Sequence, residues 1–204
     1  MSNQPDPYVL KSEEQKWIHE FNSKFLLCKD RAGFAELMRQ LQNALPFDCW
    51  GAALAELEGE YSVTSNYTNI NNFPDGLMEA YTSNAAEYFD VLVTHHFCER
   101  DFGALQRWQT TLEQTERQKD TMPAELYQKH LQWRQFLEEW GIMLDGYSIG
   151  KRTYFDNNDK WYGSIVNYAD RLTFSSRTEE IIRSLLKAQH VALLKILKPE
   201  LSPQ

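Results

Sequence analysis

The densest group of side chains that could do chemistry is the segment 95–101, which reads His-His-Phe-Cys-Glu-Arg-Asp. A metal site there would use His95 or His96 together with Cys98. Adjacent histidines diverge on any regular backbone, however, and no second cluster in the sequence supplies further ligands. We therefore favour a structural role for this segment and expect neither a metal nor a cofactor.

The sequence contains no motif of a familiar catalytic site. It has no GxSxG nucleophile elbow, no P-loop, no GxGxxG and no HExxH. Catalysis by Asp90 or His95 is the weakest alternative, because no second catalytic group can be placed near either. His130 lies on an apolar helical stripe, which favours a core or rim histidine over a general base. The residues therefore favour a protein that is not an enzyme.

A candidate binding region lies between residues 65 and 90. Tyr67 ends a predicted strand, and Leu77 and Tyr81 share one face of a predicted helix. Asp90 has apolar neighbours on both sides, so its carboxylate must be solvated, be paired, or hold a polar group of something buried. An N-cap or turn aspartate is the structural alternative.

Composition restricts the class of protein. The chain has 204 residues, 21 basic and 29 acidic, for a formal net charge of −8, and 42% of its residues are hydrophobic. These values exclude a disordered chain, and no run approaches the ~18 apolar residues of a membrane span. A pI near 5.2 argues against nucleic-acid binding by this chain alone, since phosphate contacts need clustered Lys and Arg.

Cellular location follows from the N-terminus and the cysteines. Residues 1–7 are polar and contain two prolines, unlike a signal peptide, which predicts a cytoplasmic protein with no membrane contact. Cys28, Cys49 and Cys98 form neither a disulfide framework nor a zinc motif. We expect three reduced cysteines that pack in the core.

Hydrophobic periodicity and turn residues predict the elements. Helices are expected from 12 to about 28, from about 34 to 45, from 74 or 75 past Tyr81, over about 123–140, and from 176 until Pro199 ends the last one. Strands are expected over 49–57, 61–67, 147–155 and 160–169, with a polar loop at 69–74; the segment 99–122 has no readable pattern.

This order of elements predicts the fold class. Strands come in hairpin pairs with helices on either side, which favours an α/β protein of the α+β type. We expect an αβα sandwich with an antiparallel sheet of about five strands flanked by helices. We divide the chain into a flexible lead-in at 1–11, a ligand-sensing domain at 12–198, and a linker at 199–204.

The candidate region resembles the autoinducer-binding domain of LuxR-type quorum-sensing transcription factors. That family reads N-Y, then W-x-x-x-Y, then eight residues, then D-P-V. This chain has Asn-Tyr at 66–67, Leu-Met-Glu-Ala-Tyr at 77–81 and, after eight residues, Asp-Val-Leu at 90–92. Later, Trp108 is the nearest candidate for a pocket tryptophan, and the segment 140–146 is similar to a glycine-bearing family segment.

The resemblance implies binding of a small amphipathic signal molecule between the sheet and the helices, with Asp90 accepting a hydrogen bond from its head group. The expected ligand-binding residues are Tyr67, Leu77, Tyr81, Asp90, Trp108, Trp50 and Asn167. Leu77 stands where the family has a tryptophan that donates its indole N–H to a lactone carbonyl. Loss of one buried donor costs about 1–3 kcal/mol, or roughly 5- to 150-fold in affinity. We therefore expect a ligand other than a standard acyl-homoserine lactone.

The resemblance also implies partners. Family members act as dimers and bind DNA through a helix-turn-helix domain that opens with a segment like L-S/T-P-R-E. Residues 201–204, Leu-Ser-Pro-Gln, are similar to the start of such a domain, or form a simple polar tail. We expect a homodimer that contacts DNA only through a domain absent from this sequence. The alternative is an interaction module with a filled pocket that acts by sequestering partners.

Overall fold

Four strands of ten residues and one of three form the centre of the described structure. The computed structural model describes residues 8–45, 47, 49–58, 62–84, 88, 105–142, 146–155, 160–169 and 175–201. The strands are β1 (Cys49–Glu58), β2 (Ser62–Asn71), β3 (Leu105–Arg107), β4 (Gly146–Phe155) and β5 (Lys160–Ala169). They form one five-stranded sheet in the order β2-β1-β5-β4-β3, and every pairing is antiparallel. The predicted antiparallel sheet is confirmed.

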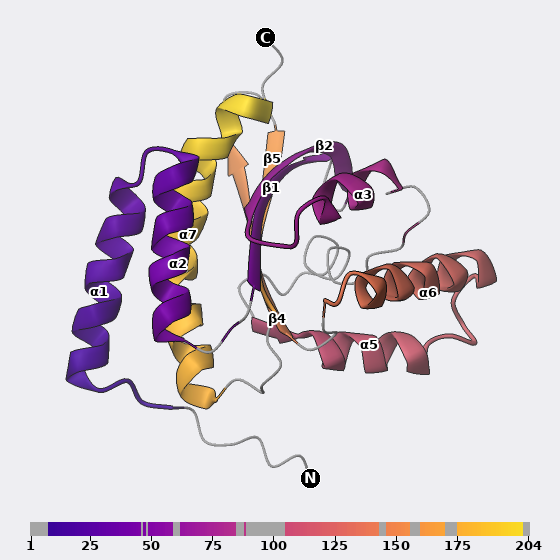
Figure 1. The fold of residues 1–204 in the computed structure, drawn as a ribbon, viewed down its shortest axis with the longest axis horizontal. Coiled ribbons are helices and arrows are strands. Elements are labelled where there is room, and N and C mark those ends of the chain that lie inside the picture. The colour runs from indigo at the N-terminus through magenta and orange to yellow at the C-terminus, as the bar shows by residue number, and fades with distance from the viewer. Residues whose placement is uncertain are drawn as a thin grey trace.

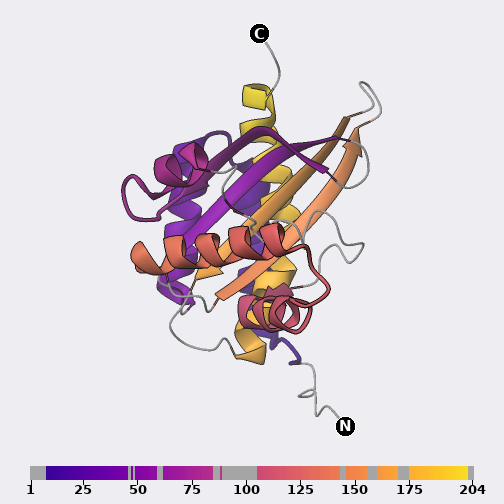
Figure 2. The ribbon, with the colours of Figure 1, turned by 90° about the vertical axis from the view of Figure 1, so that its right-hand side faces the viewer.

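Helices cover both faces of this sheet, as predicted. They are α1 (Ser12–Leu27), α2 (Arg31–Ala44), α3 (Leu77–Ser83), α5 (Trp108–Arg117), α6 (Ala124–Glu139) and α7 (Ser176–Leu201). In Figure 1, α1, α2 and α7 lie on one side of the sheet, and α3, α5 and α6 lie on the other. Figure 2 shows α6 lying across the second face.

The register of β1 shows which side chains face each layer. Trp50, Ala52 and Leu54 are buried with residues of α1, α2 and α7, so they face that helical layer. Because side chains alternate along a strand, Gly51 and Ala53 belong to the opposite face. We call the cluster between the sheet and α1, α2 and α7 the helical core.

Two pairs of polar side chains buried in the helical core are hydrogen-bonded. The Tyr168 hydroxyl lies 3.0 Å from Oε1 and 2.8 Å from Nε2 of Gln189, and both residues are fully buried. Ser164 on β5 forms a hydrogen bond with Nδ1 of His190 on α7. Burial raises the pKa of Tyr168, so its hydroxyl stays protonated and can donate. These pairs fix α7 against β5.

Two helices begin at the expected residues, Ser12 and Ser176, and each is capped by the residue before it. At α1 the Glu14 carboxylate accepts the backbone N–H of Lys11 at 2.8 Å, so Lys11 rather than Ser12 is the N-cap residue. At α7 the Ser175 hydroxyl accepts the N–H of Thr178 at 3.2 Å, ahead of the expected Ser176.

Two predicted element limits are wrong, and one helix was not predicted. Strand β2 continues to Asn71, through half of the expected polar loop. Helix α5 lies in the segment that had no readable pattern. Helix α7 continues through Pro199 to Leu201, although a proline was expected to end it, because Leu201 is buried in the helical core. The division of the chain into lead-in, domain and linker stays a prediction.

Candidate functional site

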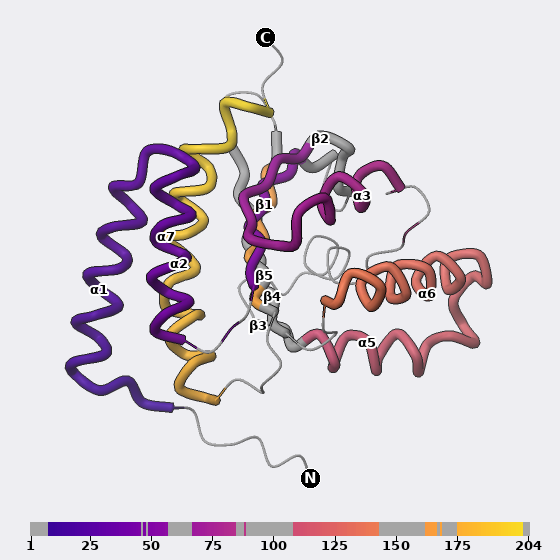
Figure 3. Tube along the Cα trace, viewed as in Figure 1, coloured from indigo at the N-terminus to yellow at the C-terminus, as the bar shows by residue number. Residues whose placement is uncertain are grey.

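A second group of buried side chains lies on the sheet face covered by α3, α5 and α6. We call it the site cluster. Its buried members are Leu77, Trp108, Trp133, Phe136, Leu137 and Ile142, and its partly buried members are Cys49, Phe73, Met78, Ala80, Tyr81, Tyr88, Leu112 and Trp140. Figure 3 traces the chain from α5 into α6, the two helices that contribute most of the buried members. Seven of these fourteen residues are aromatic, so the cluster suits a ligand with a large apolar part.

The sheet beneath the cluster carries small residues on β1. A Cβ atom added at Gly51 would lie 2.4 Å from Cε2 of Phe73, so the phenyl ring lies directly on the backbone of the strand. The backbone N–H of Phe73 donates to Oδ1 of Asn71 at 3.1 Å, which fixes the loop that carries the ring. Gly51 is therefore required for this close approach of Phe73 to the sheet.

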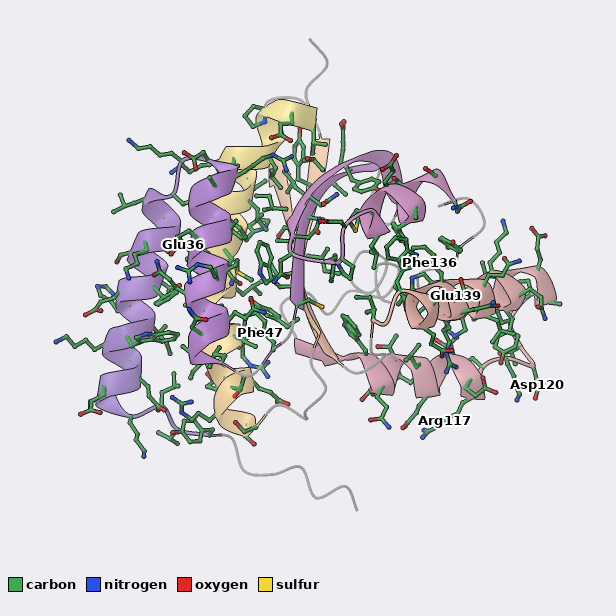
Figure 4. The ribbon with its side chains drawn as sticks, in the orientation of Figure 1. Glu36, Phe47, Arg117, Asp120, Phe136 and Glu139 are labelled. Atoms are coloured by element: carbon green, nitrogen blue, oxygen red, sulfur yellow. The ribbon has the colours of Figure 1, made fainter. Side chains whose placement is uncertain are left out.

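Aromatic rings link α3 to α6. The Phe136 centroid lies 6.1 Å from Tyr81, 5.1 Å from Tyr88 and 6.1 Å from Trp140. Tyr81 and Tyr88 are stacked, with centroids 5.9 Å apart. In Figure 4, Phe136 lies on the side of α6 near α3, whereas Arg117 and Asp120 lie at the far end of the α5 and α6 layer. The aromatic contacts thus gather on the side of α6 near α3.

The side chain of Tyr67 lies at the edge of this region, on β2. It pairs with Ala55 in the register of β1 and β2, on the site face. Its hydroxyl oxygen is buried and lies next to the Thr82 hydroxyl of α3. Burial raises the pKa of Tyr67, and the neighbouring Thr82 hydroxyl of α3 partly offsets the rise.

Three of the predicted binding residues come together. Leu77, Tyr81 and Trp108 are members of the site cluster, and Tyr67 lies on the same sheet face beside Thr82. Their role in ligand binding stays a prediction.

Of the other three predicted residues, one lies elsewhere, and two cannot be placed because they or their side chains fall outside the described part of the structure. Trp50 lies in the helical core, with its ring centroid 6.2 Å from Phe34, so its assignment to the site was wrong. The backbone of Asn167 pairs with Gly51, but its side chain lies outside the described part of the structure. Asp90 also lies outside the described residues, as do His95, His96 and Cys98.

Several residues of the cluster were not predicted as site residues. Trp133, Phe136 and Trp140 follow one another at helical spacing on α6 and its C-cap, and that spacing indicated a buried stripe without showing what it faces. Phe73 had no periodic neighbours to mark it. His130 on the same helix is 1% exposed and lies 5.8 Å from the Trp133 ring, which confirms a core histidine.

Across the described ranges, no group of three or more His, Cys, Asp or Glu side chains is arranged to hold a metal ion. None of the described helices combines the length and the apolar character needed to cross a bilayer.

Comparison with known proteins gives a clear structural result. No protein-family model matches the sequence. No curated protein matches it either. Among solved structures, the chain is similar to CepR2 from Burkholderia cenocepacia, an N-acylhomoserine lactone-dependent LuxR family transcription factor. The TM-score is 0.59 at 12% identity, over 94% of this chain and 100% of that chain.

Two structures of SdiA are similar as well. The complex of SdiA with octanoyl-rac-glycerol has a TM-score of 0.62 at 8% identity, over 92% of this chain and 68% of that one. The solution structure of E. coli SdiA 1–171 has a TM-score of 0.54 at 11% identity, over 91% and 98%. The chain therefore has the fold of the ligand-binding domains of LuxR-family transcription factors.

Proposed function

We propose that this chain is the ligand-sensing domain of a LuxR-like transcriptional regulator. The signal is a small amphipathic molecule that binds at the site cluster, between the sheet and helices α3, α5 and α6. The observation that supports this proposal most directly is the aromatic site cluster. It lies on one face of the sheet, and the separate helical core covers the other face. The fold shared with CepR2 and SdiA supports it.

The ligand is expected to differ from a standard acyl-homoserine lactone. Leu77 is 3% exposed within the site cluster, and a leucine side chain cannot donate a hydrogen bond. A site that lacks one hydrogen-bond donor should bind a lactone more weakly, by about 1–3 kcal/mol of binding free energy. SdiA has been solved with octanoyl-rac-glycerol, so proteins of this fold accept an acylated head group without a lactone ring.

Mass spectrometry of molecules that co-purify with the folded protein tests the proposal directly. The proposal is supported if an amphiphile is recovered with the wild type at near-stoichiometric amount and is lost from the Phe136→Asp variant. In a thermal-shift titration, a ligand at 100 times its Kd stabilises the protein by about 2.7 kcal/mol. A shift of several degrees at micromolar acyl-homoserine lactone would contradict the prediction about ligand type.

A second candidate is a non-catalytic interaction module that acts by sequestering partners. The ring contacts among Tyr81, Tyr88 and Phe136 favour it, because aromatic side chains then fill the cluster without a ligand. Under this alternative, no amphiphile stabilises the protein. Truncation of Phe136 to Ala then destabilises it by about 3–5 kcal/mol, as for an ordinary core residue.

Signal output requires further partners under our proposal. Ligand binding completes the site cluster and favours a homodimer, which would place two DNA-binding domains on a two-fold operator. Sedimentation velocity with and without ligand measures this directly. A monomer in both states at 50 µM (about the concentration needed for a weak dimer) would contradict the dimer proposal.

A further inference from the structure

Helix α1 has an outward face that no described element covers. In Figure 1, α1 is the outermost helix of its layer, on the side away from the sheet. Its buried side chains, Ile18, Phe21 and Phe25, belong to the helical core. The opposite face of the helix is therefore open to a partner.

Exposed apolar side chains gather at the two ends of α1. Among the described residues, four large apolar side chains are exposed, and three of them are Val9, Leu26 and Leu27. Val9 is 82% exposed, and Leu27 is 75% exposed. The segment that carries Val9 is held against the first turn of α1, because the Tyr8 hydroxyl donates to Glu14 at 3.0 Å. Val9 thus lies at one end of the helix and Leu27 at the other.

Between these ends, side chains of opposite charge alternate along one stripe of the helix. Glu13, Lys16, Glu20 and Lys24 are all exposed, and at 3.6 residues per turn they lie within about 80° around the axis, on the same stripe as Leu27. None of the four charged side chains forms an ion pair with another residue in the described ranges. We call these five residues the α1 stripe.

The order of charges in the α1 stripe is complementary to itself in an antiparallel pair of helices. When Lys16 lies beside Glu20 of a second copy, two-fold symmetry also places Glu20 beside Lys16 of that copy. The same register brings Glu13 to within one residue of Lys24 of the second copy. It also brings each apolar end of one helix beside the other apolar end of its partner. A parallel pair in register would place like charges together, which is unfavourable.

We propose that the α1 stripe is the surface through which two copies of this chain form a two-fold homodimer with antiparallel α1 helices. The inference rests on the homodimer of the proposed function and assigns a surface to it. A helix of 16 residues is about 24 Å long and about 10 Å wide, so the pair buries less than the ~1,200 Å² of a standard stable interface. The dimer should therefore be weak, with a Kd of about 10–50 µM.

The balance of charges favours a second copy over other partners of this face. A nucleic acid or an anionic membrane would need a basic surface. The α1 stripe carries two acidic and two basic side chains instead. Their alternation fits a partner with the same alternation in the opposite direction, and a second copy of α1 supplies it.

Charge reversal tests the pairing of Lys16 with Glu20. Lys16→Glu and Glu20→Lys each place like charges at two symmetric contacts, so each should raise the dimer Kd about 10-fold or more in sedimentation velocity at low salt. An equimolar mixture of the two variant proteins should recover the wild-type Kd, because the mixed dimer again pairs opposite charges at both contacts. A merely structural role for either residue would not produce this recovery.

The matched control is Glu138→Lys, which changes the net charge by the same amount as Glu20→Lys. Glu138 is exposed on α6, which lies on the other side of the sheet. This variant should keep the wild-type Kd within about 2-fold. All three substitutions are at exposed positions and should leave the Tm within about 2 °C, which shows that the variants are folded.

The apolar ends of the interface have a test of their own. Leu27→Ser should raise the dimer Kd about 3- to 10-fold, because each dimer loses two apolar contacts. Leu131→Ser on α6 is the control, since Leu131 is also exposed but lies outside the α1 stripe. It should leave the Kd unchanged.

The outcomes separate the inference from the proposed function. A wild-type dimer that is insensitive to Lys16→Glu and Glu20→Lys, or a mixture that does not recover the wild-type Kd, overturns the inference while the homodimer stands. A chain that stays monomeric from about 5 to 200 µM overturns both the inference and the homodimer, and leaves this face to a partner of another kind. Ligand binding at the site cluster is measured separately and does not depend on either result.

Discussion

The contact between Gly51 and Phe73 gives a prediction that can be worked out from the structure. Gly51→Ala places a methyl group where the ring of Phe73 now lies, 2.4 Å from Cε2 and 2.8 Å from Cζ. Real Cβ contacts are not that short, so the ring must move. The ring is packed against the site cluster, and its backbone is held by Asn71, so it has little freedom to swing aside.

The size of the effect follows from two opposing terms. Overpacking of this kind costs about 1–3 kcal/mol. Alanine has fewer conformations than glycine in the unfolded chain, which raises the free energy of unfolding by about 0.4–1 kcal/mol. The net loss is about 1–2 kcal/mol, or a fall in Tm of about 2–8 °C for a chain of this size.

Urea unfolding of four proteins tests this prediction. They are the wild type, Gly51→Ala, Phe73→Ala and the double variant. Once the ring is gone, the new methyl group has space, so Gly51→Ala should be neutral or stabilising in the Phe73→Ala background. The coupling free energy should reach about 1 kcal/mol. The same loss for Gly51→Ala in both backgrounds would refute the proposed steric origin.

Three further predictions concern other parts of the chain. Arg31 lowers the pKa of Glu200 below its ordinary 4.5 by a hydrogen bond, so Glu200 contributes stability above that pH and loses it as the pH falls through the lowered value. Because the two side chains are 44% and 39% exposed, Glu200→Gln should cost less than about 1 kcal/mol at pH 7, and the cost should shrink as the pH falls below 4.5; a difference that grows on acidification would contradict this. Leu185→Ala, at a fully buried position of α7, should cost about 2–5 kcal/mol in urea unfolding, and a loss below 1 kcal/mol would show that the core there can collapse. With a net charge of −8, the 204-residue chain should give no sequence-specific DNA retardation at submicromolar protein and low salt in a gel-shift assay.

The elements that sequence predicts best are those whose burial pattern is local and apolar. The helix at 12–27, the last helix from 176 to the residue before Pro199, and the hairpin of β4 and β5 follow from periodicity and turn residues alone. Helix α5 was missed because threonines occupy its buried positions. Thr111 and Thr115 are 4% and 6% exposed, and Thr115 donates its hydroxyl hydrogen to the Thr111 carbonyl at 2.9 Å. A threonine whose hydroxyl is hydrogen-bonded can be buried. Because its side chain is polar, however, it does not contribute to the hydrophobic periodicity from which a helix is predicted.

The end of α7 shows how tertiary contacts override a local signal. Pro199 removes one backbone donor, which is normally enough to end a helix. Here Glu200 binds Arg31 and accepts from the Thr68 hydroxyl at 2.8 Å, and Leu201 is 4% exposed in the helical core. These partners lie at the start of α2 and on β2, more than 130 positions away in sequence, so no local pattern could indicate them.

The faces of β1 explain why the site was only partly predictable. The residues on both faces of this strand are apolar. The sequence therefore indicates that both faces are buried, but it does not show which face would bind a ligand. The structure separates them by size: Trp50 and Leu54 fill the helical core, while Gly51 and Ala53 lie beneath the site cluster. The assignment of Trp50 to the site failed because large aromatic residues were expected there, whereas the aromatic residues come from the helices and the loop that cover the sheet.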